Sequence, residues 1–85
     1  MISVRCLGHI GTSLGAKEVR LDSTGLEATE IVERLRALSR QADPGFTKYN
    51  TLIMVQDGEA FVPASVNRLI RDGEQVVLIP FSHGG

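Results

Sequence analysis

A single stretch of this chain carries apolar residues at helical spacing, and strand patterns lie on both sides of it. The apolar positions of this stretch are Ala28, Ile31, Val32, Leu35 and Leu38. Charged residues lie between them, so the stretch predicts one amphipathic helix with one buried face. The 85 residues suffice for one small domain. Because one helix cannot bury its apolar side alone, we expect it to pack against a sheet.

The ends of this helix follow from the residues that flank it. We expect Thr29 to be the N-cap residue, although Thr24 followed three residues later by Glu27 also fits a capping box. The helix should end near Gln41, because the sequence Asp-Pro-Gly at 43–45 cannot continue it.

Five segments have the composition of β-strands. They are Ile2–Leu7, Lys17–Asp22, Thr51–Gln56, Glu59–Val62 and Gln75–Ile79. The first two alternate apolar and polar residues, as strands with one buried face do, and we expect them to pair antiparallel. Asp57-Gly58 is a hairpin signal. Residues 63–70 should form an irregular return.

These elements predict an α+β fold of the β-grasp (ubiquitin-like) type, with a mixed four- to five-stranded sheet and one crossing helix. First and last strands that lie parallel and adjacent need a right-handed crossover, which the helix can supply. The last strand then lies in the middle of the sheet. We expect residues 1–80 to form this domain and residues 81–85 to form a flexible C-terminal tail.

The chain ends in Gly84-Gly85, shortly after its last apolar strand. Glycine has no Cβ, so a glycine tail fits a narrow enzyme channel, whereas tails without a task are usually disordered. We therefore predict that the reactive group is the α-carboxylate of Gly85. The residues that would thread the channel with it are Pro80, Phe81, Ser82, His83 and Gly84.

The strands that follow the helix carry apolar residues on both faces. We expect the residues that point at the helix to be Leu52, Met54, Val76 and Leu78. The open face of the sheet would then present Ile53, Val55, Val77, Ile79 and Phe81. An exposed apolar patch beside a reactive tail is typical of a partner-docking surface. The alternative is that residues 63–70 cover this face.

Composition argues against several other classes of function. A formal net charge of −1 with both signs scattered argues against a nucleic-acid surface. No apolar run approaches the ~20 residues of a membrane span. The single cysteine, Cys6, excludes an internal disulfide and fits a reducing cytoplasm. It occupies an inward position of the first strand, which predicts a core residue.

Two further patterns carry no site. No metal site is expected, because Cys6, His9 and His83 lack ligand spacing. The glycine-rich segment Gly8–Ala16 fails the spacing of a phosphate-binding loop, and we interpret it as a plain loop. His9 is interpreted as a solvated residue of that loop. His83 either titrates near neutrality and alters docking of the tail or is an exposed bystander.

From Asp72 onward the chain reads D-G-E-Q-V-V-L-I-P-F-S-H-G-G, which resembles the C-terminus of the MoaD/ThiS family of ubiquitin-like sulfur carriers. The segments that extend this resemblance over nearly the whole chain are Met1–Arg5, Leu14–Val19, Ala28–Val32 and Val55–Glu59. Residues 81–83 depart from the family's tail, which often has a second proline and small residues there.

The resemblance implies a carrier protein rather than an enzyme. An adenylating enzyme of the ubiquitin-activating type would use MgATP to make a Gly85 acyl-adenylate. A sulfurtransferase or another persulfide donor would then displace AMP and leave a Gly85 thiocarboxylate. No cofactor would be bound permanently. The pathway stays open among molybdopterin, thiamine and cysteine synthesis and tRNA thiolation, and the chain could be the small subunit of a synthase beside a large subunit.

Two alternatives to a sulfur carrier stay open. One is a ubiquitin-like protein modifier that is joined through Gly85 to lysines of target proteins. The other is a β-grasp interaction module with an inert tail. The chain has only two lysines, Lys17 and Lys48, which argues against chains of this protein on itself.

Overall fold

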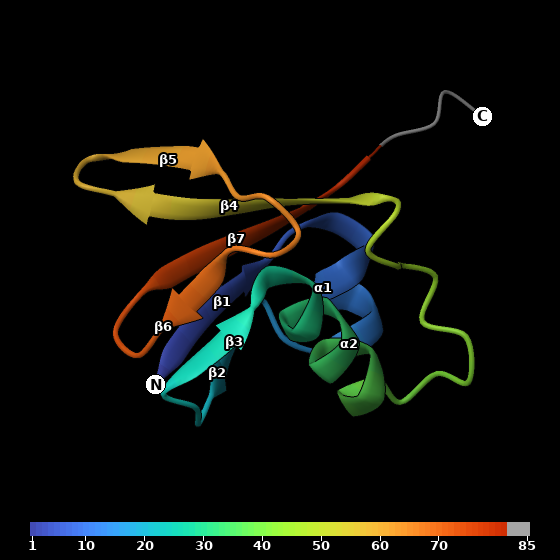
Figure 1. Cartoon of the computed structure of the whole chain (residues 1–85). Helices are drawn as coiled ribbons and strands as arrows, with labels where there is room; N and C mark the ends of the chain where they lie inside the picture. The colour runs from blue at the N-terminus through green and yellow to red at the C-terminus, as the bar shows by residue number, and fades with distance from the viewer. Residues whose placement is uncertain (82–85) are drawn as a thin grey trace.

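Five strands form one mixed sheet in the order β2-β1-β7-β4-β5, and the helix α2 (Ala28–Leu38) lies across one of its faces (Figure 1). The strands are β1 (Ile2–Cys6), β2 (Glu18–Leu21), β4 (Thr51–Asp57), β5 (Ala60–Pro63) and β7 (Gln75–Pro80). The computed structural model describes residues 1–81. The tail residues Ser82, His83, Gly84 and Gly85, to which the sequence assigns the reactive end, lie outside the described residues.

The last strand, β7, occupies the middle of this sheet. It pairs in parallel with β1, where Val4 is opposite Val76, and antiparallel with β4, where Ile53 is opposite Leu78. The predicted parallel pairing of the first and last strands is therefore confirmed, as is the antiparallel pairing of β1 with β2. The chain has the predicted β-grasp arrangement, in which the C-terminal end leaves from a strand that is held on both sides.

A second helix, α1 (Gly8–Leu14), replaces the predicted loop. Its residue Ile10 is fully buried in the core, and Gly15 ends the helix in the left-handed conformation with φ of 70°. Gly11 lets α1 approach β1 closely, because a Cβ there would lie 2.7 Å from the Cys6 carbonyl oxygen. The glycine-rich composition predicted a loop because glycine disfavours helices; the burial of Ile10 favours the helix instead.

The helix α2 begins and ends earlier than predicted. Its N-cap is Glu27, not Thr24 or Thr29. The backbone N–H of Glu27 donates to Oε1 of Glu30 at 3.0 Å, and the two glutamates form a reciprocal capping box. The helix ends at Leu38 rather than near residue 41 because Ser39 has an extended backbone. The Ser39 hydroxyl lies 2.9 Å from the hydroxyl of Ser13 in α1.

Two short strands form a separate small sheet that the sequence did not predict. They are β3 (Gly25–Glu27) and β6 (Leu69–Arg71), which pair antiparallel with Leu26 opposite Ile70. Both of these apolar residues are buried. The predicted irregular return over residues 63–70 is therefore correct only for residues 64–68, because Pro63 belongs to β5 and Leu69 begins β6.

The hydrophobic core lies between the large sheet and the helices. The buried apolar residues are Ile2, Val4, Cys6, Ile10, Leu21, Leu26, Ala28, Ile31, Val32, Leu35, Phe46, Ile53, Val55, Ile70, Val76 and Leu78. Cys6 is a core residue, as predicted. Within residues 1–81, no helix combines the length and the apolar character that crossing a membrane requires.

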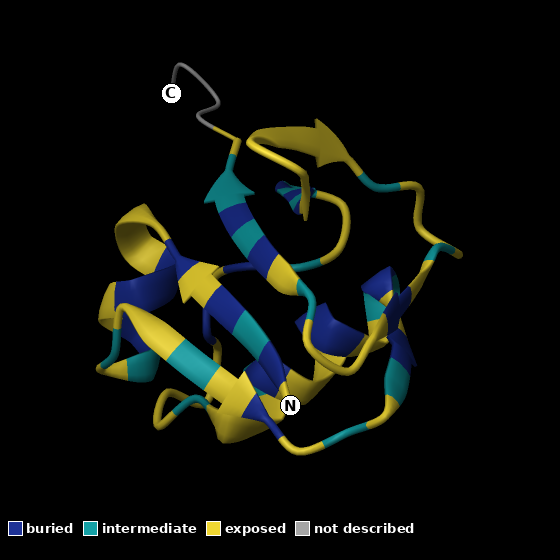
Figure 2. Cartoon of the chain, turned by 90° about the vertical axis from the view of Figure 1, so that its left-hand side faces the viewer, coloured by how far each residue is buried: buried dark blue, intermediate teal, exposed yellow. Residues whose placement is uncertain are grey.

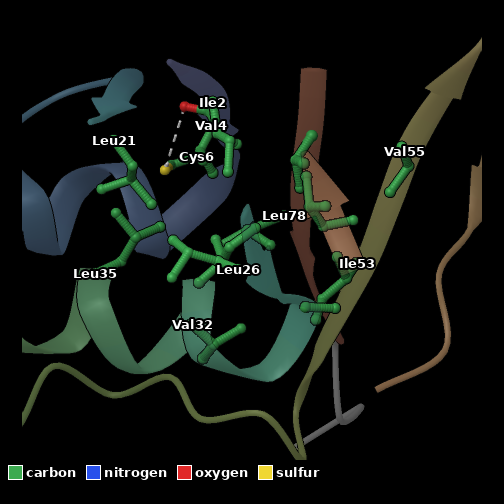
Figure 3. Packing of buried hydrophobic residues seen from close by; sticks show 14 of the residues in the cluster. Ile2, Val4, Cys6, Leu21, Leu26, Val32, Leu35, Ile53, Val55 and Leu78 are labelled. Atoms are coloured by element: carbon green, nitrogen blue, oxygen red, sulfur yellow. Dashed lines mark hydrogen bonds between the residues drawn. The ribbon is translucent and has the colours of Figure 1, made fainter. Parts of the chain in front are cut away.

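The predicted register of β4 is wrong. Ile53 and Val55 belong to the buried cluster together with Leu78 (Figure 3), whereas Leu52 and Met54 are only half-buried. The physical reason is the pairing with β7, because directly opposed residues in neighbouring strands point to the same face. Since Ile53 is opposite Leu78 and Val55 is opposite Val76, both must face the helix.

Candidate functional site

The chain leaves the sheet at the end of β7, where the connection from α2 enters β4 (Figure 1). Pro80 is opposite Thr51 in the pairing of β7 with β4. One residue later, the Phe81 backbone N–H donates to the Asn50 carbonyl oxygen at 2.9 Å. On the other side, the Leu7 N–H donates to the Leu78 carbonyl oxygen at 3.1 Å. The chain is therefore held on both sides as far as Leu78, and on the β4 side as far as Phe81. We call Pro80 and Phe81, together with the residues that contact them, the tail base; these residues are Gly8, Asn50 and Thr51.

On the β1 side, the start of α1 packs against the tail base. A Cβ at Gly8 would lie 3.1 Å from Cγ of Pro80, and the φ of Gly8 is +55°, so a larger residue would be both strained and crowded there. An open hollow of about 780 Å³ lies next to this contact, and its lining includes Leu7, Gly8, Arg5 and Lys17. Leu7 exposes 39% of its surface, so this side of the tail base is open to a partner.

On the β4 side, a tight turn at residues 47–50 borders the tail base. The Asn50 side chain organises this turn: its Oδ1 accepts from the Thr47 N–H at 2.7 Å, and its Nδ2 donates to the Gly45 carbonyl oxygen at 3.4 Å. The Asn50 N–H also donates to the Thr47 carbonyl oxygen. Phe46, fully buried in the core, anchors the turn to the domain. The residue that holds Phe81 is thus itself fixed in place.

Tyr49 projects from this turn and is 82% exposed. Its backbone N–H donates to Oγ1 of Thr47 at 3.1 Å, which fixes the backbone that carries the ring. The ammonium nitrogen of Lys48 lies 5.3 Å from the centroid of the Tyr49 ring, within the range of a cation–π interaction. Tyr49 has no signal in the sequence, because periodicity carries no information about a residue in an irregular connection.

The open face of the sheet adjoins the tail base. From Val76 to Ile79 in β7, buried residues alternate with half-buried ones, and Pro80 after them is also half-buried (Figure 2). The half-buried residues Val77 and Ile79 lie on the open face, opposite Met54 and Leu52 of β4. Beyond them, Phe81 is 48% exposed. This apolar strip forms the observed open-face patch.

Three of the five predicted docking residues, Val77, Ile79 and Phe81, are accessible, whereas Ile53 and Val55 lie in the core. Leu52 and Met54 take their place. One signal could have indicated this: Gln56 follows Met54 at strand spacing, and a polar residue belongs to the solvent side of its strand.

The thiol of Cys6 is buried in the core. Burial raises the pKa of the Cys6 thiol to about 11, so the thiolate that acts as a nucleophile is scarce at neutral pH. Within residues 1–81, no cluster of three or more His, Cys, Asp or Glu side chains is arranged to hold a metal ion. The features of this site are therefore a fixed tail base, an apolar patch and an exposed aromatic turn.

No protein-family model matches the sequence, and a search of curated proteins gives no match. Solved structures do share the fold. SAMP1 from Haloferax volcanii has a TM-score of 0.69 at 16% identity, with 99% of this chain and 98% of that chain covered. A second structure, of H. volcanii small archaeal modifier protein 1, has a TM-score of 0.68 at 16% identity, with 95% and 97% covered.

The third similar structure is the BexX/CysO complex of Amycolatopsis orientalis. The matched chain has a TM-score of 0.65 at 16% identity, with 100% of this chain and 100% of that chain covered. At this identity the likeness shows the fold alone. All three similarities extend over nearly the full length of this chain. The shared fold therefore includes the whole arrangement of strands and helices. The predicted β-grasp, ubiquitin-like fold is confirmed.

Proposed function

We propose that this protein is a ubiquitin-like sulfur carrier whose Gly85 α-carboxylate is adenylated and then converted to a thiocarboxylate. The observation that carries the proposal is the tail base: the central strand β7 delivers the chain to Phe81, which the Asn50 carbonyl holds at 2.9 Å. Only four residues separate Phe81 from the end of the Gly-Gly sequence. A rigid origin limits the positions that a short tail can reach, which favours delivery of its end into an enzyme site.

The similar structures support a carrier or modifier role in general. One of them is a small archaeal modifier protein, and CysO is found in a complex with BexX, so a protein of this fold binds another protein. By analogy, we propose that this chain acts as a substrate and carrier, not as an enzyme. Its partners would be an adenylating enzyme, a sulfur donor and an acceptor such as a synthase subunit.

The proposed chemistry takes place on the main-chain carboxylate. A carboxylate oxygen of Gly85 attacks the α-phosphorus of MgATP in the activating enzyme, and pyrophosphate leaves. The terminal sulfur of a persulfide on the donor protein then attacks the carbonyl carbon, and AMP leaves. A second thiol cleaves the resulting acyl disulfide, which releases the Gly85 thiocarboxylate and leaves a disulfide on the donor. The buried Cys6 thiol takes no part in these steps.

The open-face patch is the proposed docking surface for the activating enzyme. Its residues are Leu52, Met54, Val77, Ile79 and Phe81. Half-buried apolar side chains next to a reactive tail favour this assignment, because the centres of protein interfaces are apolar and poor in charge. Of the predicted tail thread, residues 82–85 would enter the channel of that enzyme, while Pro80 and Phe81, which β4 holds, would lie at its mouth.

An intact-mass measurement tests this function. The chain is incubated with a ubiquitin-activating-type enzyme, MgATP and a persulfide donor, beside a variant that lacks Gly85 and the variant Cys6→Ala. We expect a mass shift equal to the replacement of one oxygen by sulfur in the wild type and in Cys6→Ala, and no shift without Gly85. A shift that disappears in Cys6→Ala would place the sulfur on the thiol and contradict the proposal.

The second candidate is a protein modifier that forms an isopeptide bond between Gly85 and lysines of other proteins. The likeness over nearly the full length to a small archaeal modifier protein favours keeping this candidate. In the same experiment with added protein acceptors, a modifier would give large lysine-linked adducts that depend on Gly85. If an enzyme that is active on another carrier produces neither thiocarboxylate nor adducts, both functions are wrong.

A further inference from the structure

The length of the tail constrains where a partner enzyme can lie, and this inference rests on the proposed function. Four residues follow Phe81, and a fully extended chain of four residues spans at most about 14 Å. An enzyme that acts on the Gly85 carboxylate must therefore bring its active site within that distance of the tail base. Since an active-site channel has walls, those walls must come close to the residues around Pro80 and Phe81.

The turn at residues 47–50 is one feature that such walls would meet. It borders the tail directly, because Asn50 accepts the hydrogen bond of the Phe81 N–H. Four hydrogen bonds fix its shape: Thr47 N–H to Asn50 Oδ1, Tyr49 N–H to Thr47 Oγ1, Asn50 N–H to the Thr47 carbonyl, and Asn50 Nδ2 to the Gly45 carbonyl. A preformed surface loses little conformational entropy on binding.

Tyr49 has the properties of an interface anchor. It is the most exposed large hydrophobic residue among residues 1–81, at 82%, and tyrosine is enriched among residues whose truncation costs most binding energy. Lys48 places a positive charge over the ring. Lys48 also lines a shallow hollow with Glu30 and Glu33, yet it makes no ion pair within residues 1–81. Its charge is available to a partner.

We propose that Tyr49, with Lys48 beside it, is a specificity-determining contact of the carrier: it docks on the mouth of the activating enzyme's tail channel. The partner surface that fits is an apolar patch for the ring, next to a carboxylate that pairs with the Lys48 ammonium. The contact lies outside the open-face patch and on the α2–β4 connection. It separates activating enzymes that accept this chain from those that reject it.

Exchange of labelled pyrophosphate into ATP tests the contact, because it reports formation of the Gly85 adenylate without any later step. The enzyme is one that shows Gly85-dependent exchange with the wild-type chain. We expect Tyr49→Ala to raise KM about tenfold or more with little change in kcat, as loss of an interface anchor does. Tyr49→Phe keeps the ring and should stay close to the wild type. Lys48→Gln should raise KM at low salt and less at high salt.

A matched control separates the contact from a general loss of apolar surface. Val66→Ala also truncates an exposed apolar residue, at 53% exposure, but Val66 lies beside Thr29 at the start of α2. We expect the KM of the enzyme for the Val66→Ala chain to equal its KM for the wild-type chain. Tyr49→Ala should unfold at the wild-type temperature, because the ring is almost fully exposed.

Two outcomes overturn the proposal, and they are distinguishable. If the wild type supports exchange and Tyr49→Ala has the same KM, this contact is wrong while the carrier function stands. If the wild type supports no exchange with enzymes that are active on another carrier, the carrier function fails and this inference fails with it.

Discussion

The single thiol of the chain shows how a residue's position decides its chemistry. Cys6 exposes only 3% of its surface, among the side chains that β1 directs toward the helices. Alternation along the first strand predicted this position correctly, because inward and outward residues alternate in a strand. Burial raises the pKa of its thiol to about 11. The sulfur that a carrier of this kind handles would therefore come from a partner.

The raised pKa of Cys6 predicts a loss of stability at high pH. The unfolded chain releases the thiol proton near the ordinary value of 9.0, whereas the folded chain keeps it until about 11. Between these two values the folded state binds more protons, so the free energy of unfolding falls as the pH rises. Urea unfolding of the wild type and of Cys6→Ala across this window measures the effect. As the pH rises, the free energy of unfolding of the wild type should fall relative to that of Cys6→Ala. A difference between the two free energies that does not change with pH would contradict the prediction.

At the scale of elements, both helices begin at residues that capping rules do not favour. Leu7 precedes α1 without a side-chain hydrogen bond, and Glu27 precedes α2. Serine, threonine, aspartate and asparagine are the preferred N-caps, which is why Thr24 and Thr29 were predicted instead. The strand β3 ends at Glu27, so the pairing of β3 with β6 decides where α2 begins. A neighbouring element thereby overrides a local preference.

The capping box of α2 provides a stability prediction. Glu30→Ala removes the oxygen that accepts the Glu27 N–H at 3.0 Å, and we expect the free energy of unfolding to fall by about 1 kcal/mol. Glu30→Gln keeps an acceptor and should lose less. Thr29→Ala serves as the control, since Thr29 is not the N-cap. Chemical denaturation measures all three variants, and a larger loss for Thr29→Ala than for Glu30→Ala would show that the cap is assigned wrongly.

At the scale of the whole molecule, the chain leaves the sheet from its central strand, β7. β7 pairs with β1 on one side and with β4 on the other, while β2 and β5 form the two edges. All four residues of β5 are exposed. The strand that leads to the tail base therefore cannot open without breaking the pairing on both of its sides. This would suit the proposed role, in which a short tail is presented in a constant direction.

Hydrogen exchange tests this distribution of stability. We expect the backbone amides of Val76 and Leu78 in β7 to exchange slowest, because the central strand opens only with the whole domain. The amides of β5 should exchange faster, through local opening at the edge. Measurement of native-state exchange by NMR resolves both groups. Protection of β5 equal to that of β7 would mean that the sheet opens as one unit.

Much of the fold followed from local patterns in the sequence. The periodicity of residues 28–38 predicted α2, alternation predicted β1 and β2, and the apolar run after Gln75 predicted β7. The Asp57-Gly58 signal predicted the hairpin of β4 and β5, because a two-residue turn of this type has few alternatives. Of the candidate site, the sequence predicted that Val77, Ile79 and Phe81 are accessible and that the last strand is central.

Other features depended on contacts between segments far apart in the chain. Leu52 and Met54 lie on the open face because β4 takes its register from β7, and a strand that is apolar on both faces carries no signal of its own about which face is buried. α1 forms because Ile10 is buried in the core. The glycine-rich composition of this segment carries no signal of that burial. Tyr49 lies near the tail base because β4 pairs with β7 and Asn50, directly before β4, accepts the hydrogen bond of the Phe81 N–H. Periodicity and turn signals describe a residue's nearest neighbours along the chain. The sequence alone therefore determined α2, the five strands of the large sheet and the reactive-tail hypothesis. Only the tertiary structure decided α1, β3 and β6 and which side chains lie around the tail base, because these depend on contacts between distant segments.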